Sequence, residues 1–157
     1  MINLLKTLAG EWTGFGIGEY PTITSFEYLE TLRFTLDETG EGLQYKQRTR
    51  RRVFGGGDYI PSHKEDGVIR LLADNQVEVS NTQLGGREEM LLGTIEATSD
   101  GLVLRLQSTR FANDPRMEEA TRIITLAEDT LHYTMHMQTD QVPHLSLHLE
   151  ATLRRSV

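Results

Sequence analysis

The sequence predicts an all-β domain, an up-and-down antiparallel β-barrel of about ten strands with a short N-terminal helix. Apolar and polar residues alternate along most of the chain, which is the period of a half-buried strand. The links between these alternating segments are short and rich in turn residues, as in consecutive hairpins. The 157 residues contain no repeat, linker or low-complexity segment, so we expect one domain over 1–157.

The chain begins with a short helical candidate and a glycine-rich strand. Residues 2–9 suit one or two helical turns, and the stretch 10–23 follows. One face of this stretch carries Trp12, Gly14, Gly16, Gly18 and Tyr20. Glycine weakens a strand interior and usually marks a sharp bend or a close approach to the backbone. Both interpretations turn the glycines inward. Trp12 would then close one end against Arg154 or Arg155, as the Gly-x-Trp of lipocalin-like barrels does.

The next segments continue the alternation. Residues 26–36 place aromatic and aliphatic side chains on one face, which Glu30 interrupts, so Glu30 is either partnered inside or lies near an open end. The pair Asp100-Gly101 is a strong hairpin signal. The remaining strand candidates are 43–54, 67–72, 76–81, 87–97, 102–108, 121–126, 131–139 and 144–155, and the longer irregular segments are 55–66 and 110–119.

Closure into a barrel would remove the sheet edges, which favours a barrel over the alternative of a β-sandwich. A barrel of about ten strands is too wide for its own side chains to fill. We therefore expect an enclosed cavity for a small-molecule ligand.

Composition excludes several classes of function. The net charge of −7 argues against a nucleic-acid partner. The absence of cysteine excludes disulfides, zinc–thiolate sites, iron–sulfur clusters and thiol nucleophiles, and is compatible with the cytoplasmic location that we expect. No apolar run approaches the roughly 20 residues that span a bilayer, so no membrane partner is expected. The basic cluster 46–52 is interpreted as a solvated strand end. Glu88 and Glu89, which are adjacent to each other, are interpreted as solvated charge.

Two motifs together resemble one known family. GEWTGFG, followed by Gly18 and by Tyr-Pro-Thr-Ile at 20–23, resembles the signature Gly-x-Trp-x-Gly-x-Gly…Tyr-Pro-Thr-Ile of nitrobindins. HLEATLRR at 148–155 resembles the closing strand of nitrobindins. Segments 62–70 and 131–137 resemble two further segments of the same family, so the resemblance spans nearly the whole chain. It implies a barrel like that of fatty-acid-binding proteins, with heme b at one open end. It also implies reversible nitric oxide binding and isomerisation of peroxynitrite to nitrate.

The resemblance also implies a set of site residues. His148 inherits the axial position on the heme iron, and no side chain is assigned a catalytic role. The other residues expected to border the cofactor are Thr22, His63, Arg116, Gly14, Gly16 and Gly18. The loop of Arg116 differs from the lysine-bearing version of the family. The segments 40–42 and 55–66 also depart from the family pattern, which would reshape the pocket on the face opposite the axial ligand.

The alternation of the last strand conflicts with an inward His148. His148 shares a face with His144, the second candidate ligand, about 13 Å away along an extended strand. Simple alternation would turn the leucines of the opposite face into the barrel. Either those leucines pack under the N-terminal helix or a partner subunit, which leaves room for a homodimer, or the strand bulges near the mouth. His132 and His136 are expected to face solvent, and His63 falls in a polar loop.

Two other functions stay open. The first is a carrier of a fatty acid or similar apolar ligand without heme, which the expected cavity would suit. Such carriers usually anchor a carboxylate on interior arginines, whereas Arg33 and Arg105 alternate outward, which disfavours this function. The second is an interaction module whose cavity is vestigial.

Overall fold

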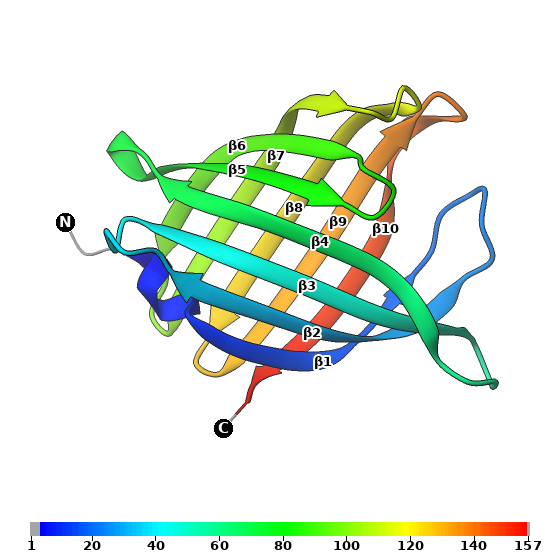
Figure 1. The fold of residues 1–157 in the computed structure, drawn as a ribbon, viewed down its shortest axis with the longest axis horizontal. Coiled ribbons are helices and arrows are strands. Elements are labelled where there is room, and N and C mark those ends of the chain that lie inside the picture. The colour runs from blue at the N-terminus through cyan, green and yellow to red at the C-terminus, as the bar shows by residue number, and fades with distance from the viewer. Residues whose placement is uncertain (1–3, 157) are drawn as a thin grey trace.

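The computed structural model describes residues 4–156 and confirms the predicted antiparallel β-barrel (Figure 1). Ten strands follow one another around the barrel in sequence order, and β1 closes it by pairing with β10. The elements are the 3₁₀-helix η1 (Leu4–Leu8), β1 (Gly10–Gly18), β2 (Phe26–Leu36), β3 (Gly42–Val53), β4 (Ile60–Leu71), the 3₁₀-helix η2 (Ala73–Asn75), β5 (Gln76–Gln83), β6 (Glu88–Ala97), β7 (Gly101–Ala112), β8 (Met117–Ala127), β9 (Thr130–Thr139) and β10 (Val142–Arg155). Within the described residues, no helix is long and apolar enough to cross a bilayer.

Two predicted irregular segments prove to be largely strand. β4 begins at Ile60 and not near residue 67, and β7 and β8 leave only residues 113–116 between them. The polar side chains of the first half of β4 hid its alternation. His63 therefore lies on a strand and not in a loop, and Glu65 on the same face is 1% exposed. A strand whose inward side chains are polar lacks the alternation of apolar and polar residues by which strands are predicted from sequence.

Trp12 closes one end of the barrel as expected. Its side chain is fully buried with Leu5 and Leu8, and its Nε1 donates a hydrogen bond to the carbonyl oxygen of Leu8 at 2.9 Å. Of the two arginines considered, Arg155 is the partner, and its guanidinium carbon lies 4.2 Å from the centroid of the indole ring. Arg155 Nη1 also donates to the carbonyl oxygen of Ala9 at 2.6 Å, which ties η1 to the last strand.

A β-bulge in β10 resolves the conflict over the last strand. Leu147 pairs with His136 and Leu149 pairs with Met135, so His148 is an extra residue with no partner in the β9 register. The bulge lets His148 and Leu149 both line the interior. Beyond the bulge, the leucine face continues into the core. The predicted bulge near the mouth is therefore confirmed.

The glycines of β1 make room for neighbouring rings of the protein itself. A Cβ on Gly16 would overlap the ring of Tyr28, and one on Gly18 would overlap the ring of Phe26. A Cβ on Gly14 would overlap the backbone of β10. Phe26 and Tyr28 line the cavity of this barrel, so Gly16 and Gly18 lie behind the cavity wall.

Candidate functional site

A cavity of about 380 Å³ occupies the barrel. It extends from the apolar floor formed by Leu32, Phe34, Ile69, Val79 and Leu106 to a rim that includes Ile23, which is 43% exposed. This volume falls within the range of about 300–1,000 Å³ typical of small-molecule sites. The barrel therefore holds the cavity that its strand number predicts.

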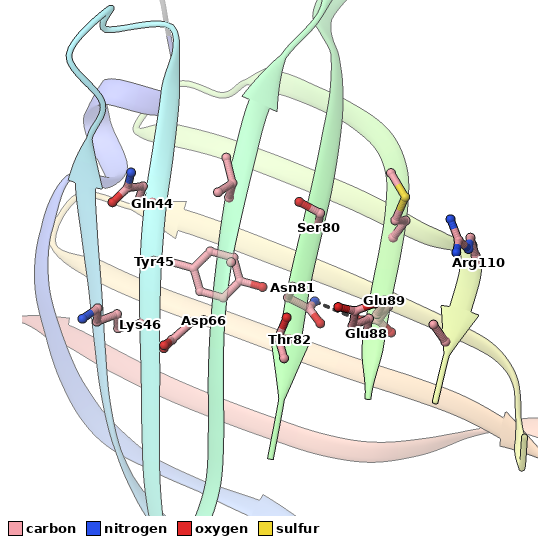
Figure 2. A pocket seen from close by; sticks show the side chains of 14 residues that line it. Gln44, Tyr45, Lys46, Asp66, Ser80, Asn81, Thr82, Glu88, Glu89 and Arg110 are labelled. Atoms are coloured by element: carbon pink, nitrogen blue, oxygen red, sulfur yellow. Dashed lines mark hydrogen bonds between the residues drawn. The ribbon is translucent and has the colours of Figure 1, made fainter. Parts of the chain in front are cut away.

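A second depression, of about 530 Å³, lies on the outer face of β3 to β7 (Figure 2). Its wall includes exposed side chains, which alternate along the strands with the side chains that face the barrel interior. The exposed ones include Lys46, Ser80 and Thr82. Figure 2 also shows Asn81 hydrogen-bonded to Glu89 behind this surface. The depression contains no histidine. The interior cavity is therefore the candidate site for a cofactor held by imidazole.

His148 lies on the cavity wall with one nitrogen engaged, and the other has no hydrogen-bond partner among residues 4–156. Its Nδ1 lies 3.0 Å from the carbonyl oxygen of Glu19. Because a carbonyl oxygen only accepts hydrogen bonds, Nδ1 carries the proton and the lone pair is on Nε2. The Glu19 N–H donates to the His148 carbonyl oxygen at 2.8 Å, and the Tyr20 ring packs edge-on at 5.6 Å between centroids. Burial lowers the pKa of His148, which favours the neutral, ligating ring.

His63 lines the same cavity, from β4. Its Nε2 lies 3.3 Å from Oε1 of Glu65, and its side chain is 31% exposed. The structure thus brings two of the sequence-predicted site residues to one cavity, His148 from β10 and His63 from β4. His144 is exposed and does not line the cavity.

A buried ionic network lies beside His63. Arg122 Nη1 donates to Glu65 Oε2 at 2.7 Å, and Arg122 Nη2 donates to Glu89 Oε1 at 2.6 Å. Tyr45 donates its hydroxyl to Glu65 at 2.7 Å. Glu89 is 1% exposed, so the interpretation of this residue as solvated charge is wrong. Burial raises the pKa of Glu65, but Arg122 and His63 outweigh burial and hold that pKa well below its usual range.

A second buried carboxylate has, among the described residues, only neutral hydrogen-bond partners. Glu30 is 3% exposed and accepts hydrogen bonds from the Tyr133 hydroxyl and from Gln47 Nε2, the latter at 3.1 Å. The hydroxyls of Tyr28 and Tyr133 lie 2.8 Å apart. Burial, as the largest effect, raises the pKa of Glu30 to about 7. Glu30, which interrupts the apolar face of β2, therefore has its partners inside the barrel. This was one of the two alternatives, the other being a place near an open end.

The other predicted site residues lie away from the cavity wall. Thr22 is exposed, and the neighbouring Ile23 lines the rim in its place. Arg116 is in the β7–β8 link and is paired with Asp114 through Nε at 2.9 Å and Nη2 at 3.0 Å. Neither Thr22 nor Arg116 nor any of the three β1 glycines lines the cavity.

Besides Arg122, two further arginines that sequence reasoning did not place in the site line the cavity, Arg51 and Arg87. Arg51 contacts the Phe26 ring at 5.6 Å from its guanidinium carbon. Arg87 binds Asp114 and Gln83, and its buried Nε has no hydrogen-bond partner among the described residues. Counting by two from the inward Tyr45 reaches Arg51, so the alternation of β3 held this signal. Arg51 is exposed near the end of β3, as the interpretation of the basic cluster as a solvated strand end expects, and it also borders the cavity.

Comparisons with known proteins agree over the full barrel. A family model described as the THAP4-like, heme-binding beta-barrel domain matches residues 1–155. A protein named peroxynitrite isomerase 2 from Mycobacterium ulcerans is 35% identical over 158 residues, which cover 98% of this chain and 94% of that relative. One from Arabidopsis thaliana, named peroxynitrite isomerase Rv2717c, is 35% identical over 150 residues, which cover 95% of this chain and 85% of that relative. The crystal structure of Rv2717c from M. tuberculosis matches with a TM-score of 0.86 at 30% identity, covering 100% of this chain and 99% of that one.

Proposed function

Because the chain belongs to the family of THAP4-like heme-binding β-barrel domains, we propose that it holds heme b through His148, binds nitric oxide and isomerises peroxynitrite to nitrate. The observation that carries the proposal is the free Nε2 of His148 on the wall of the cavity. The names of the relatives from M. ulcerans and A. thaliana support the reaction.

The residues of the cavity fit a heme. The apolar floor suits a porphyrin face, and the unpartnered Nε of Arg87 suits a propionate carboxylate. Arg51, on the same wall, offers a second guanidinium. His148 would supply the axial nitrogen, oriented by its hydrogen bond to Glu19.

Each part of the chain has a distinct role in the proposed reaction. Ferric heme, when bound, supplies the chemistry that cleaves the O–O bond of peroxynitrite and lets the fragments recombine as nitrate. With His148 as its single protein ligand, the iron would remain open to a small ligand. The barrel wall confines the fragments, and His63 presents a polar side chain to the cavity. The network of Glu65, Arg122 and Glu89 fixes the position of that side chain from behind.

Of the arginines that line the cavity, Arg122 gives no support to the alternative of a fatty-acid carrier. Arg122 is paired with two carboxylates, Glu65 and Glu89, and so has no net positive charge to offer a fatty-acid headgroup. A further carboxylate placed there would be a third negative charge in a buried site, which is costly.

A hemin titration of the purified chain tests the proposal, with His148→Ala and the matched control His144→Ala. We expect the wild type and the control to bind hemin and to share the absorption and electron paramagnetic resonance signature of one axial imidazole. His148→Ala should lose that signature. Peroxynitrite mixed with the loaded wild type should give a larger nitrate-to-nitrite ratio than buffer does. An unchanged spectrum in His148→Ala would remove the proposed ligand.

A further inference from the structure

Two buried tyrosine–carboxylate pairs lie at the cavity, whose wall includes both tyrosines and Glu65 but not Glu30. Tyr133 donates its hydroxyl to Glu30, and Tyr45 donates its hydroxyl to Glu65 at 2.7 Å. Tyr133 is 8% exposed and Tyr45 is 6% exposed, so the phenols are in similar surroundings. Neither pair has a role in holding the cofactor. The difference between the pairs lies in what else each carboxylate contacts.

The two carboxylates differ in their ability to accept a proton. Glu65 is bound to the cationic Arg122 at 2.7 Å, which makes it a weak base. Within the part of the chain that the structure describes, Glu30 receives hydrogen bonds only from the neutral Tyr133 and Gln47, and burial raises its pKa to about 7.

The strands packed against Glu30 place no charged side chain directly opposite it. Its register partners on β1 and β3 are Gly14 and Thr49. Charge reaches it from a distance, from Glu65, which raises its pKa, and from Arg122, which lowers it. Glu30 is therefore the stronger base of the two.

The hydrogen bonds around Tyr133 set up a transfer of its proton. Its single hydroxyl hydrogen goes to Glu30, so the Tyr28 hydroxyl, 2.8 Å away, donates to the Tyr133 oxygen. Gln47 Nε2 lies within 3.4 Å of the same oxygen. Removing an electron from a phenol makes its hydroxyl strongly acidic, and a separated charge in a buried site is costly. A phenol already bonded to a base can lose the electron and the proton together.

We propose that Tyr133 is a built-in electron donor to nitrogen dioxide that enters the cavity, with Glu30 as the acceptor of its phenolic proton. In this step, Tyr133–OH, the Glu30 carboxylate and nitrogen dioxide give the Tyr133 phenoxyl radical, protonated Glu30 and nitrite. One electron passes to nitrogen dioxide, and one O–H bond breaks as another forms. The importance of this oxidant rests on the proposed function, since nitrogen dioxide is the fragment that escapes when peroxynitrite breaks. The donor site itself requires no heme.

The test uses the full heme-free chain and nitrogen dioxide generated by pulse radiolysis of nitrite solutions. The phenoxyl radical is followed by its absorbance. A second nitrogen dioxide adds to the radical to give 3-nitrotyrosine, which peptide mass spectrometry assigns to a residue. We expect nitration of Tyr133 to exceed that of Tyr45 and to rise as the pH increases through about 7, where Glu30 becomes a carboxylate. Glu30→Gln should slow Tyr133 oxidation by on the order of 10²-fold, the usual effect of a built-in base.

Control variants separate the proposal from general reactivity. Tyr45→Phe should leave the nitration of Tyr133 unchanged, and Tyr133→Phe should remove the pH-dependent part of the radical absorbance. Equal nitration of Tyr45 and Tyr133, or a flat pH profile in the wild type, overturns the proposal without any variant. Because heme is absent from this test, a negative result would not bear on the proposed heme binding. A negative hemin titration would likewise not bear on electron donation by Tyr133.

Discussion

Replacing Glu30 with glutamine should abolish a pH dependence of stability that this one side chain creates. Burial raises the pKa of folded Glu30 from the ordinary 4.5 to about 7, so the folded chain binds this proton more tightly than the unfolded chain does. The resulting stabilisation is complete below about pH 4.5, declines as pH rises, and is gone above about pH 7. A glutamine at this position would keep an acceptor for the Tyr133 hydroxyl and has no proton to lose.

The size of the effect follows from the two pKa values. A difference of about 2.5 at about 1.36 kcal/mol per pH unit amounts to about 3 kcal/mol. This value is not discounted for solvent screening, because Glu30 is 3% exposed. The free energy of unfolding of the variant minus that of the wild type should therefore increase by about 3 kcal/mol between about pH 4.5 and pH 8.

Urea unfolding of the heme-free chain at several pH values in this range measures the difference. The other carboxylates titrate alike in both proteins, so their effects cancel in the difference curve. The exposed Glu118→Gln serves as a control, since Glu118 is hydrogen-bonded to Gln138 on the surface, and its curve should run parallel to the wild type. Parallel curves for Glu30→Gln and wild type would refute the buried, proton-binding role of Glu30.

Two further substitutions test the interior packing, both by urea unfolding of the heme-free chain. Arg122→Met should destabilise the fold by about 3–5 kcal/mol, because it leaves two buried carboxylates without their cation. The exposed Arg105→Met should change little, and equal effects of the two would argue against the network. Gly16→Ala should cost about 1–3 kcal/mol, because the new Cβ overlaps the Tyr28 ring. Gly56→Ala, with no atom within 4 Å, is the matched change, and a similar loss there would contradict the packing argument.

The architecture was predictable from alternation and turns, whereas the interior chemistry was only partly so. The sequence places Trp12 beside an arginine of the last strand, and it allows a bulge at His148. It does not reveal that Arg122 and Glu89 face inward, because charged side chains are rarely buried unless they are paired, and their partners are far away in sequence. Both lie on the inward face of their strands, which a strict count by two would show. Their pairing joins β4, β6 and β8 through residues far apart in sequence, and no local pattern encodes such a contact.

The bulge in β10 also bears on how such a site arises or disappears. His148 is one residue more than the β9 ladder needs, so deleting that codon would leave Leu147 and Leu149 in an uninterrupted ladder. The barrel would keep its closure and its leucine core while losing the imidazole of His148. Under the proposed function, a single in-frame deletion at this position would remove the iron ligand while leaving the strand order of the barrel intact.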